Sequence, residues 1–163
     1  MNRSLVLALA FAAASATALA ADCPDDSGPR AAVQSYLTAM QDHRFNDAYD
    51  FVTASMTDAK SREDWAALQK LFYEGGEVNI LSIDIRKAQA DASDAACAAR
   101  AAVPNILKSR DKFNNQGTTE FEIYTVINDG EAWKVDAQET LFDAAGVQQW
   151  FPGEEVPDFR DQY

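Results

Sequence analysis

Few residues in this 163-residue chain have side chains suited to acid–base or nucleophilic chemistry. The one histidine, His43, stands between Asp42 and Arg44 in a segment typical of a solvated turn between helices. With one histidine in such a turn and one pair of cysteines, we expect neither a His-containing nucleophilic triad nor a zinc site with several His ligands. No Gly-rich phosphate loop occurs in the sequence. The sequence therefore predicts no catalytic residue, no metal site and no cofactor.

Acidic residues stand next to each other at Asp25-Asp26, Glu63-Asp64 and Glu154-Glu155. All three pairs fall where we expect helix caps, turns or a tail. A carboxylate in such a place is stabilised by water or by the positive end of a helix dipole. We therefore interpret these pairs as solvated groups rather than as a divalent-cation site.

The first twenty residues have the features of a cleavable secretory signal. Arg3 gives the start a positive charge, an apolar run follows, and Ala18-Leu19-Ala20 has the small-x-small pattern of a cleavage site. A membrane anchor is disfavoured because the apolar run is short and rich in alanine. Lipidation of Cys23 is disfavoured because Asp22, rather than a small residue, precedes it. We predict that residues 1–20 are removed and that the mature protein resides in the periplasm.

The two cysteines, Cys23 and Cys97, lie far apart in the sequence. They have no C-x-x-C spacing and no basic neighbour of the kind that lowers a thiol pKa, which argues against a catalytic role. An isolated pair of cysteines in an exported chain usually forms a disulfide. We predict a Cys23–Cys97 bond that ties the extended N-terminal segment to a central strand. In the chain-entropy model, a disulfide that closes a loop as long as the one between these two cysteines stabilises a fold by about 4 kcal/mol.

The chain is acidic, with 14 Lys and Arg against 26 Asp and Glu and a formal net charge of −12. Cleavage of the signal removes only one charged residue, Arg3. A polyanionic partner is disfavoured by this charge, so we expect no binding to nucleic acid and, after cleavage, none to anionic membranes. The part beyond residue 20 has the size of one ordinary domain with an adequate core.

Three helices are expected in the first half of the chain. The first begins at Ser27-Gly28-Pro29, where the missing N–H of proline costs nothing. Its apolar residues, from Val33 to Met40, recur at i, i+3, i+4 and i+7 as in an amphipathic helix. A second, short helix is predicted over about residues 46–53. Ser61 resembles the N-cap of the third helix, which we expect to end at Gly75-Gly76.

From residue 78 onward apolar and polar residues alternate, which is typical of strands with one wet face. We expect four strands, at about residues 78–86, 95–103, 118–128 and 131–140. The second has an alanine content that also suits a helix, but its place between strands and Pro104 after it favour a strand. Residues 108–117 are expected to form a polar loop. Asp129-Gly130 predicts a hairpin between the last two strands.

The order of these elements indicates an α+β domain, with three N-terminal helices packed on one face of a curved antiparallel sheet of about four strands. We divide the chain into a signal peptide (1–20), an extended segment (21–29), the folded domain (30–142) and a C-terminal part (143–163). The C-terminal part is predicted to hold a short helix through Trp150 and then an acidic tail.

The pair of segments Ala32-Val33-Gln34-Ser35-Tyr36-Leu37 and Phe45-Asn46-Asp47-Ala48-Tyr49 resembles the opening of NTF2-like domains, the nuclear transport factor 2 and ketosteroid isomerase superfamily. More closely, it resembles small exported bacterial members of unknown function, of the DUF4878 type. The segment 61–72 and the final hairpin with Ala132-Trp133-Lys134-Val135 fit the same order, so the resemblance covers about residues 30–142. It implies a cone, in which a bent sheet wraps around helices and often leaves an apolar cavity at the wide end.

Five aromatic residues on predicted inward faces are the candidate lining of that cavity: Tyr36, Trp65, Phe72, Phe121 and Trp133. Small residues around Ala99 and Ala101 would leave room opposite these rings. The alternative is that the same rings fill a packed core. Trp150-Phe151-Pro152 in the C-terminal part would cover the opening or meet a partner, unless it packs on its own domain.

The isomerase branch of the superfamily implies a carboxylate base together with a tyrosine and a protonated acid as hydrogen-bond donors. Tyr36 suits the tyrosine. The base has no match: Asp47 and Asp50 are candidates only by proximity, and Glu120 and Glu122 are expected to face away from the interior because Phe121 and Ile123 face inward.

Three functions therefore stay open. The first is a non-catalytic binding or interaction module of the periplasm, with a small apolar molecule or an envelope protein as partner. The second is a lyase or isomerase acting on a hydrophobic substrate, and the third is a structural envelope protein with a filled core. The oligomeric state is also open, with a homodimer through the outer face of the sheet as one option.

Overall fold

The computed structural model describes residues 21–91 and 93–156. The predicted signal peptide lies outside the described residues, and so does the end of the acidic tail from residue 157 onward. Within the described part of the chain, no helix has the length and apolar character needed to cross a membrane.

Four α-helices and one short 3-10 helix occur in the described residues. They are α1 (Ser27–Gln41), α2 (Phe45–Ala48), η1 (Tyr49–Phe51), α3 (Arg62–Gly76) and α4 (Ala144–Trp150). The first three predicted helical segments are present, with the second divided between α2 and η1. The fourth helix lies in the part that we had set apart from the domain.

The two ends of α3 show what its sequence signals do. Ser61 is the N-cap as predicted, and its hydroxyl accepts a hydrogen bond from the Asp64 N–H at 3.2 Å. The helix ends at Gly76, as predicted, but both glycines are helical and the residue in the left-handed conformation is Glu77, with φ 54°. Backbone bonds from Glu77 and Val78 to the last turn close the helix there, so glycine is not required at the left-handed position.

The strands form one antiparallel sheet in the order β1-β3-β4-β5, with the short β2 also paired to β3. Their bounds are β1 (Asn79–Ile85), β2 (Gln89–Ala90), β3 (Arg100–Arg110), β4 (Thr118–Asn128) and β5 (Trp133–Thr140). The α+β prediction is confirmed. Within the described residues the domain has four α-helices rather than three, because the short helix predicted through Trp150, α4, belongs to it, and β2 is one short strand more than expected.

Strand β3 is displaced from its predicted place. It begins at Arg100 rather than near residue 95, and it runs through Pro104 to Arg110, into the segment predicted as a polar loop. The Asp94 carboxylate accepts hydrogen bonds from the N–H groups of Ala99 and Arg100 and thereby holds the alanine-rich segment before β3 as a loop.

The disulfide between Cys23 and Cys97 is present. Cys97 lies in the loop before β3 rather than in a central strand, which corrects the predicted attachment point. On the other side, the Cys23 N–H bonds to the carbonyl of Ala88 at 2.9 Å, so the N-terminal segment runs beside β2. The bond therefore fixes this segment against the edge of the sheet.

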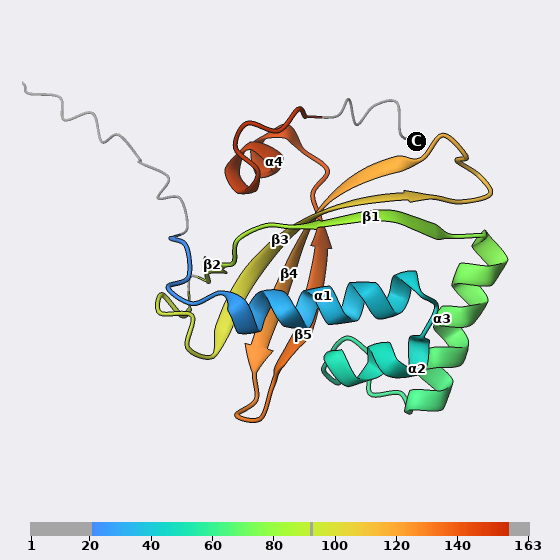
Figure 1. The fold of residues 1–163 in the computed structure, drawn as a ribbon, viewed down its shortest axis with the longest axis horizontal. Coiled ribbons are helices and arrows are strands. Elements are labelled where there is room, and N and C mark those ends of the chain that lie inside the picture. The colour runs from blue at the N-terminus through green and yellow to red at the C-terminus, as the bar shows by residue number, and fades with distance from the viewer. Residues whose placement is uncertain (1–20, 92, 157–163) are drawn as a thin grey trace, which may run out of the picture.

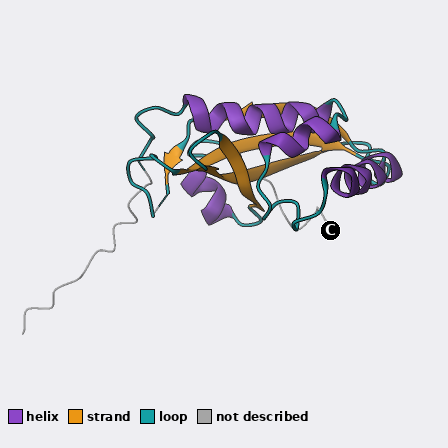
Figure 2. Ribbon diagram, turned by 90° about the horizontal axis from the view of Figure 1, so that it is seen from below, coloured by secondary structure: helices purple, strands orange, loops and turns teal. Residues whose placement is uncertain are grey.

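Both faces of the sheet are covered. α1 crosses the face that we call the inner face, where it contacts β1, β3, β4 and β5, and α4 lies on the opposite, outer face (Figures 1 and 2). Inner residues such as Val103, Tyr124 and Val126 belong to the core under α1. Outer residues such as Phe121 and Ile123 belong to a second apolar cluster under α4.

The aromatic segment Trp150-Phe151-Pro152 takes part in this outer cluster. Phe151 is 3% exposed, and its ring meets that of Phe121 edge to face with the centroids 5.0 Å apart. The segment thus packs on its own domain. It therefore gives no support for a cover over the cavity or for a contact with a partner. α4 also occupies part of the outer face, which was the surface considered for a homodimer.

Candidate functional site

A cavity of about 260 Å³ lies between α1, the end of α3 and the inner face of the sheet. Its walls combine aliphatic side chains with tyrosines and carboxylates. The lining residues are Tyr36, Leu37, Met40, Tyr73, Val78, Ile80, Leu107, Ser109, Asp111, Glu120, Glu122, Tyr124 and Gln138. The volume suits a small organic molecule rather than a large one.

Glu122 is the most constrained polar group of the cavity. It stands in the middle of β4 and is 1% exposed. Its oxygens accept hydrogen bonds from Asn105 Nδ2 at 2.8 Å, from the Tyr124 hydroxyl at 3.0 Å and from Gln138 Nε2 at 2.5 Å. Burial raises the pKa of Glu122 to about 7, although the three donors oppose the shift. The group therefore exchanges its proton near neutral pH.

The register of the sheet assembles this network. Asn105 of β3 lies directly opposite Glu122 of β4, and Tyr124 lies two residues further along the same face. The carboxylate is therefore held by neighbours on two strands. The Oδ1 atom of Asn105 is buried and makes no hydrogen bond within the described part of the chain.

Tyr36 contributes the second notable group. The apolar stripe of α1 turns its ring toward the sheet, where it meets the Tyr124 ring edge to face at 6.2 Å between centroids. Tyr36 is 7% exposed, yet its hydroxyl has no hydrogen-bond partner among the described residues. Burial, followed by the charges of Tyr73 and Glu122, raises its pKa well above the usual range. The hydroxyl is thus a neutral, unused donor at the cavity wall.

Two further carboxylates border the same space. Burial and the nearby charge of Asp111 raise the pKa of Glu120 above its usual value. Asp111 also accepts hydrogen bonds from two backbone N–H groups of the β3–β4 turn, whereas Glu120 has no hydrogen-bond or ion-pair partner among the described residues. Tyr73 completes this side, and burial raises its pKa to about 12.

The structure brings only one of the five predicted lining residues to the cavity. Tyr36 borders it, and whether it touches a ligand stays a prediction. Trp65 is buried in the core under α1, Trp133 packs against that core from its edge, and Phe72 is 60% exposed. Phe121 lies on the outer face under α4. Trp65, Phe72, Phe121 and Trp133 thus do not line this cavity.

The error at Phe121 has one cause. Alternate residues of a strand point to opposite faces, and we had taken the apolar set of β4 as the inner one. The polar set is the inner one, so Glu122 and Tyr124, which sequence reasoning placed outside, border the cavity. A sequence signal for the correct orientation lies further along the chain. Leu141, Val147 and Phe151 form an apolar surface that must pack against an apolar face of the sheet, which is the face with Phe121.

The two base candidates chosen by proximity lie elsewhere. Asp47 forms an exposed ion pair with Arg44 at 2.8 Å, and Asp50 forms one with Arg62. His43 is exposed in the turn after α1, as predicted, and stacks on Phe45 with the ring centroids 5.5 Å apart. None of them reaches the cavity under α1.

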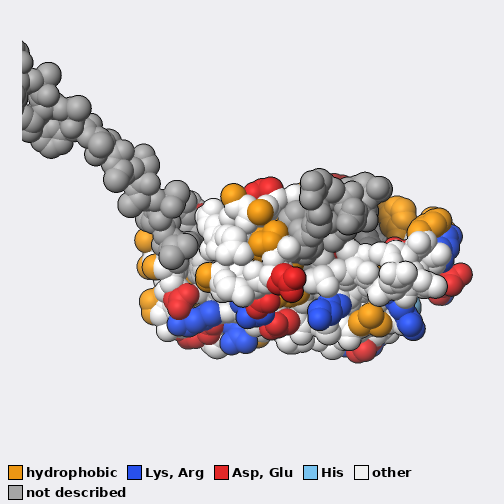
Figure 3. Space-filling view, turned by 90° about the horizontal axis from the view of Figure 1, so that it is seen from above, with side chains coloured by type: hydrophobic (Ala, Val, Ile, Leu, Met, Phe, Trp, Pro, Cys, Tyr) orange, Lys and Arg blue, Asp and Glu red, His pale blue; other side chains and the backbone are white. Residues whose placement is uncertain are grey.

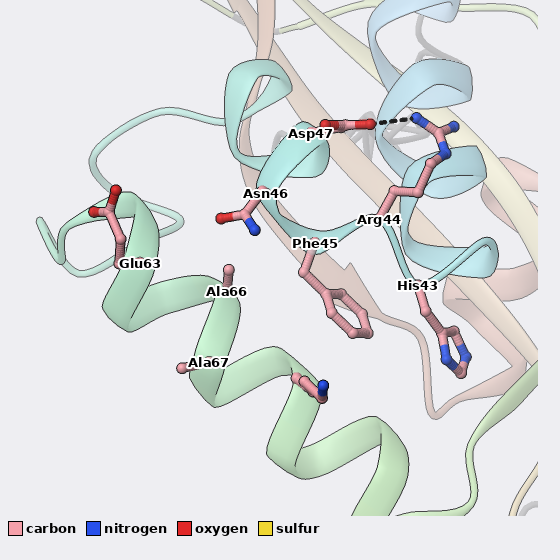
Figure 4. A pocket seen from close by; sticks show the side chains of 9 residues that line it. His43, Arg44, Phe45, Asn46, Asp47, Glu63, Ala66 and Ala67 are labelled. Carbon is pink, nitrogen blue, oxygen red and sulfur yellow. Dashed lines mark hydrogen bonds and ion pairs between the residues drawn. The ribbon is translucent and has the colours of Figure 1, made fainter.

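A second hollow, an open groove of about 510 Å³, separates α2 from α3 (Figure 4). His43, Phe45 and Ala66 border it, and the ion pair between Arg44 and Asp47 lies at its rim. Its charged side chains are exposed, and two of them, Arg44 and Lys70, already form ion pairs, with Asp47 and Glu74. Among the described residues, no group of three His, Cys, Asp or Glu side chains is arranged to hold a metal ion. We therefore treat the cavity under α1 as the candidate site.

No protein-family model matches this chain, and no curated protein matches it. Solved structures do. A SEC-C motif containing protein from Rhodopseudomonas palustris is 13% identical, with a TM-score of 0.54 over 72% of this chain and 81% of that one. A domain of unknown function with a cystatin-like fold from Nostoc punctiforme is 12% identical, with a TM-score of 0.53 over 78% and 82%.

A ketosteroid isomerase-like protein from Erwinia carotovora atroseptica is 15% identical, with a TM-score of 0.51 over 72% of this chain and 97% of that one. The fold is NTF2-like. At these identities the likeness concerns the fold alone, and it leaves the finer resemblance to the DUF4878 type a prediction.

Proposed function

We propose that this protein is an exported NTF2-like module of the bacterial periplasm that binds a small organic molecule in the cavity under α1, without catalysing its conversion. The single observation that carries the proposal is the cavity itself, where Tyr36, a residue only 7% exposed, has a hydroxyl with no partner in the described part of the chain. A hydroxyl that the protein leaves without a partner at a cavity wall is available to a ligand or to water.

The case for export rests on two features. The N-terminal sequence has the pattern of a secretory signal, and the Cys23–Cys97 disulfide suits an oxidising compartment. Both support a periplasmic location. Fractionation of cells that produce the full chain, followed by N-terminal sequencing, tests this part directly: a periplasmic protein that begins at Ala21 is expected, and a cytoplasmic protein that begins at Met1 would contradict it.

Binding is tested by filling the cavity. Ser109 lies on the inner face of β3 at the cavity wall, so Ser109→Tyr is expected to occupy the space. Its neighbour Lys108 is exposed, and its side chain points to the other face, so Lys108→Tyr is the matched control. The probes are small aromatic alcohols, amines and acids of about ten heavy atoms, a size suited to a cavity of this volume.

Backbone amide shifts in NMR spectra report where each probe binds. We expect at least one probe to move the signals of cavity residues in the wild-type chain and in Lys108→Tyr, and to lose this effect in Ser109→Tyr. The proposal fails if no probe moves those signals, or if Ser109→Tyr, folded by its spectrum, binds as well as the wild type.

A second candidate is acid–base catalysis on a hydrophobic substrate, and one observation favours it. Glu122 has a pKa of about 7 and lies beside tyrosine hydroxyls, which is the kind of group that moves protons in isomerases. Of the three carboxylates that border the cavity, only that of Glu120, which is half-buried, has no hydrogen-bond or ion-pair partner among the described residues. We expect no turnover of enolisable ketones. Turnover that disappears in both Tyr36→Phe and Glu122→Gln would establish this second function instead.

A further inference from the structure

The lining of the cavity holds acidic side chains and no basic ones. Three carboxylates, Asp111, Glu120 and Glu122, border it, and none of its lining residues is Lys, Arg or His. On the face shown in Figure 3, by contrast, basic and acidic side chains lie next to each other. Several such pairs are explicit, among them Lys87 with Asp22 and Arg86 with Asp84, both at 2.9 Å.

None of the three cavity carboxylates forms an ion pair with a basic residue of the described chain. The charge of Asp111 disfavours that of Glu120, the charge of Glu120 disfavours that of Glu122, and burial disfavours the ionised forms of Glu120 and Glu122 further. A positive charge between them would relieve both effects. The cavity lining contains no basic residue, so a positively charged ligand could supply this charge.

The remaining wall shows which kind of cation fits. Tyr36, Tyr73 and Tyr124 line the same cavity as the carboxylates, and aromatic faces attract organic cations. The Tyr36 hydroxyl adds a neutral hydrogen-bonding group that has no partner in the described residues. Leu37, Met40 and Leu107 offer an apolar surface to the rest of the ligand.

These features suit an ammonium group that carries a hydrocarbon part better than they suit a bare metal ion. A metal ion of the calcium or magnesium type requires several converging oxygen ligands, and the described residues hold no such group of three acidic, Cys or His side chains. A hydrocarbon part would use the aliphatic wall, which a metal ion leaves empty.

We propose that the cavity selects small organic amines, bound in their protonated form between Glu120, Glu122 and the tyrosine rings, over neutral or anionic molecules of the same size. This inference rests on the proposed function, since it names the ligand class of the same cavity.

Three probes of similar size and different charge test the selection: 2-phenylethylammonium, 2-phenylethanol and phenylacetate. Affinities are measured by calorimetry and NMR on the oxidised chain at a pH of about 8, where the amine is protonated and Glu122 is ionised. We expect the ammonium ion to bind at least about tenfold more tightly than the alcohol, and phenylacetate to bind more weakly than both.

Carboxylate-to-amide variants assign the effect to the cavity. Glu122→Gln and, separately, Glu120→Gln are expected to weaken the binding of the ammonium ion by about tenfold and to leave the alcohol nearly unchanged. Glu139→Gln, an exposed position on β5 outside the cavity wall, removes the same charge and is expected to change neither affinity. Glu120→Gln keeps the test decisive if Glu122→Gln does not fold.

The possible results separate the two proposals. If no probe binds, the proposed binding function fails together with this inference. If the alcohol or phenylacetate binds as tightly as the ammonium ion, the cavity is a binding site but its selection for amines is wrong. If Glu139→Gln weakens amine binding as much as Glu120→Gln does, the preference comes from net charge and the inference also fails.

Discussion

Strand β4 separates two buried regions of opposite character. On its outer face Phe121 and Ile123 pack in an apolar cluster under α4, whereas on its inner face Glu122 and Tyr124 border a polar cavity under α1. Apolar burial of the first kind stabilises a fold. Burial of an ionisable group opposes folding whenever the group is charged. The main apolar core also lies on the inner face, beside the cavity, so both faces stabilise the fold. The comparison indicates that only the cavity part of the inner face gives up some of this stability to hold functional groups.

The largest expected effect comes from the outer face. Phe121→Ala removes a buried ring that meets Phe151, and we expect the free energy of unfolding to fall by about 3–5 kcal/mol. Urea unfolding followed by circular dichroism measures this change. α4 should lose its protection from hydrogen exchange, because Phe121 is part of the surface to which it attaches.

A matched change on the inner face sharpens the comparison. Tyr124→Phe deletes only the hydroxyl that donates to Glu122, which we expect to cost about 1 kcal/mol. If Phe121→Ala cost less than Tyr124→Phe, the apolar cluster under α4 would stabilise the fold less than one hydrogen bond of the cavity does, and the contrast between these two regions would be wrong.

Sequence reasoning succeeded where a local signal fixes local structure. The Ser61 cap, the Asp129-Gly130 turn between β4 and β5, and the Cys23–Cys97 pair are each readable within a few residues or by pairing the only two cysteines. The α+β class followed from the order of these elements. None of these inferences required knowledge of which strands are neighbours.

The candidate site could not be read in this way, because it depends on which face of the sheet each helix covers. The alternation in β4 is clear, but it is the same whether Phe121 or Glu122 faces α1. Only the place of α4 decides between them. The contact of Asn105 with Glu122 depends in addition on the register of β3 against β4. The sequence therefore predicted the strand correctly and its two faces in reverse.

The next largest effect is the dependence of the free energy of unfolding on pH, through Glu122. The pKa of Glu122 is raised from 4.5 to about 7 in the folded chain. Between these values the folded chain keeps a proton that the unfolded chain has released, so the free energy of unfolding falls as pH rises from about 4.5 through 7. The loss from this group is up to about 3 kcal/mol, since one pKa unit corresponds to about 1.4 kcal/mol.

Glu122→Gln removes this titration. We expect the variant to lose less stability than the wild type over that pH range and to become the more stable chain at about pH 8, as measured by urea unfolding at several pH values. Glu139→Gln is the control and should follow the wild type. Phe121→Ala should lower the whole curve without changing its slope. If Glu122→Gln shows the same slope as the wild type, the carboxylate is already ionised at low pH and the inner face carries no buried proton.

The smallest expected effect on stability belongs to Tyr36→Phe. The deleted hydroxyl has no hydrogen-bond partner among the described residues, so the free energy of unfolding should change by less than about 0.5 kcal/mol. Tyr124 differs from Tyr36, because its hydroxyl donates a hydrogen bond to Glu122 and its removal should lower the free energy of unfolding. The same urea titrations compare the two variants. A loss as large as that of Tyr124→Phe would mean that the Tyr36 hydroxyl already has a partner within the folded chain. The inner face would then be a closed hydrogen-bond network, and the free donor that we assign to ligand binding would not exist.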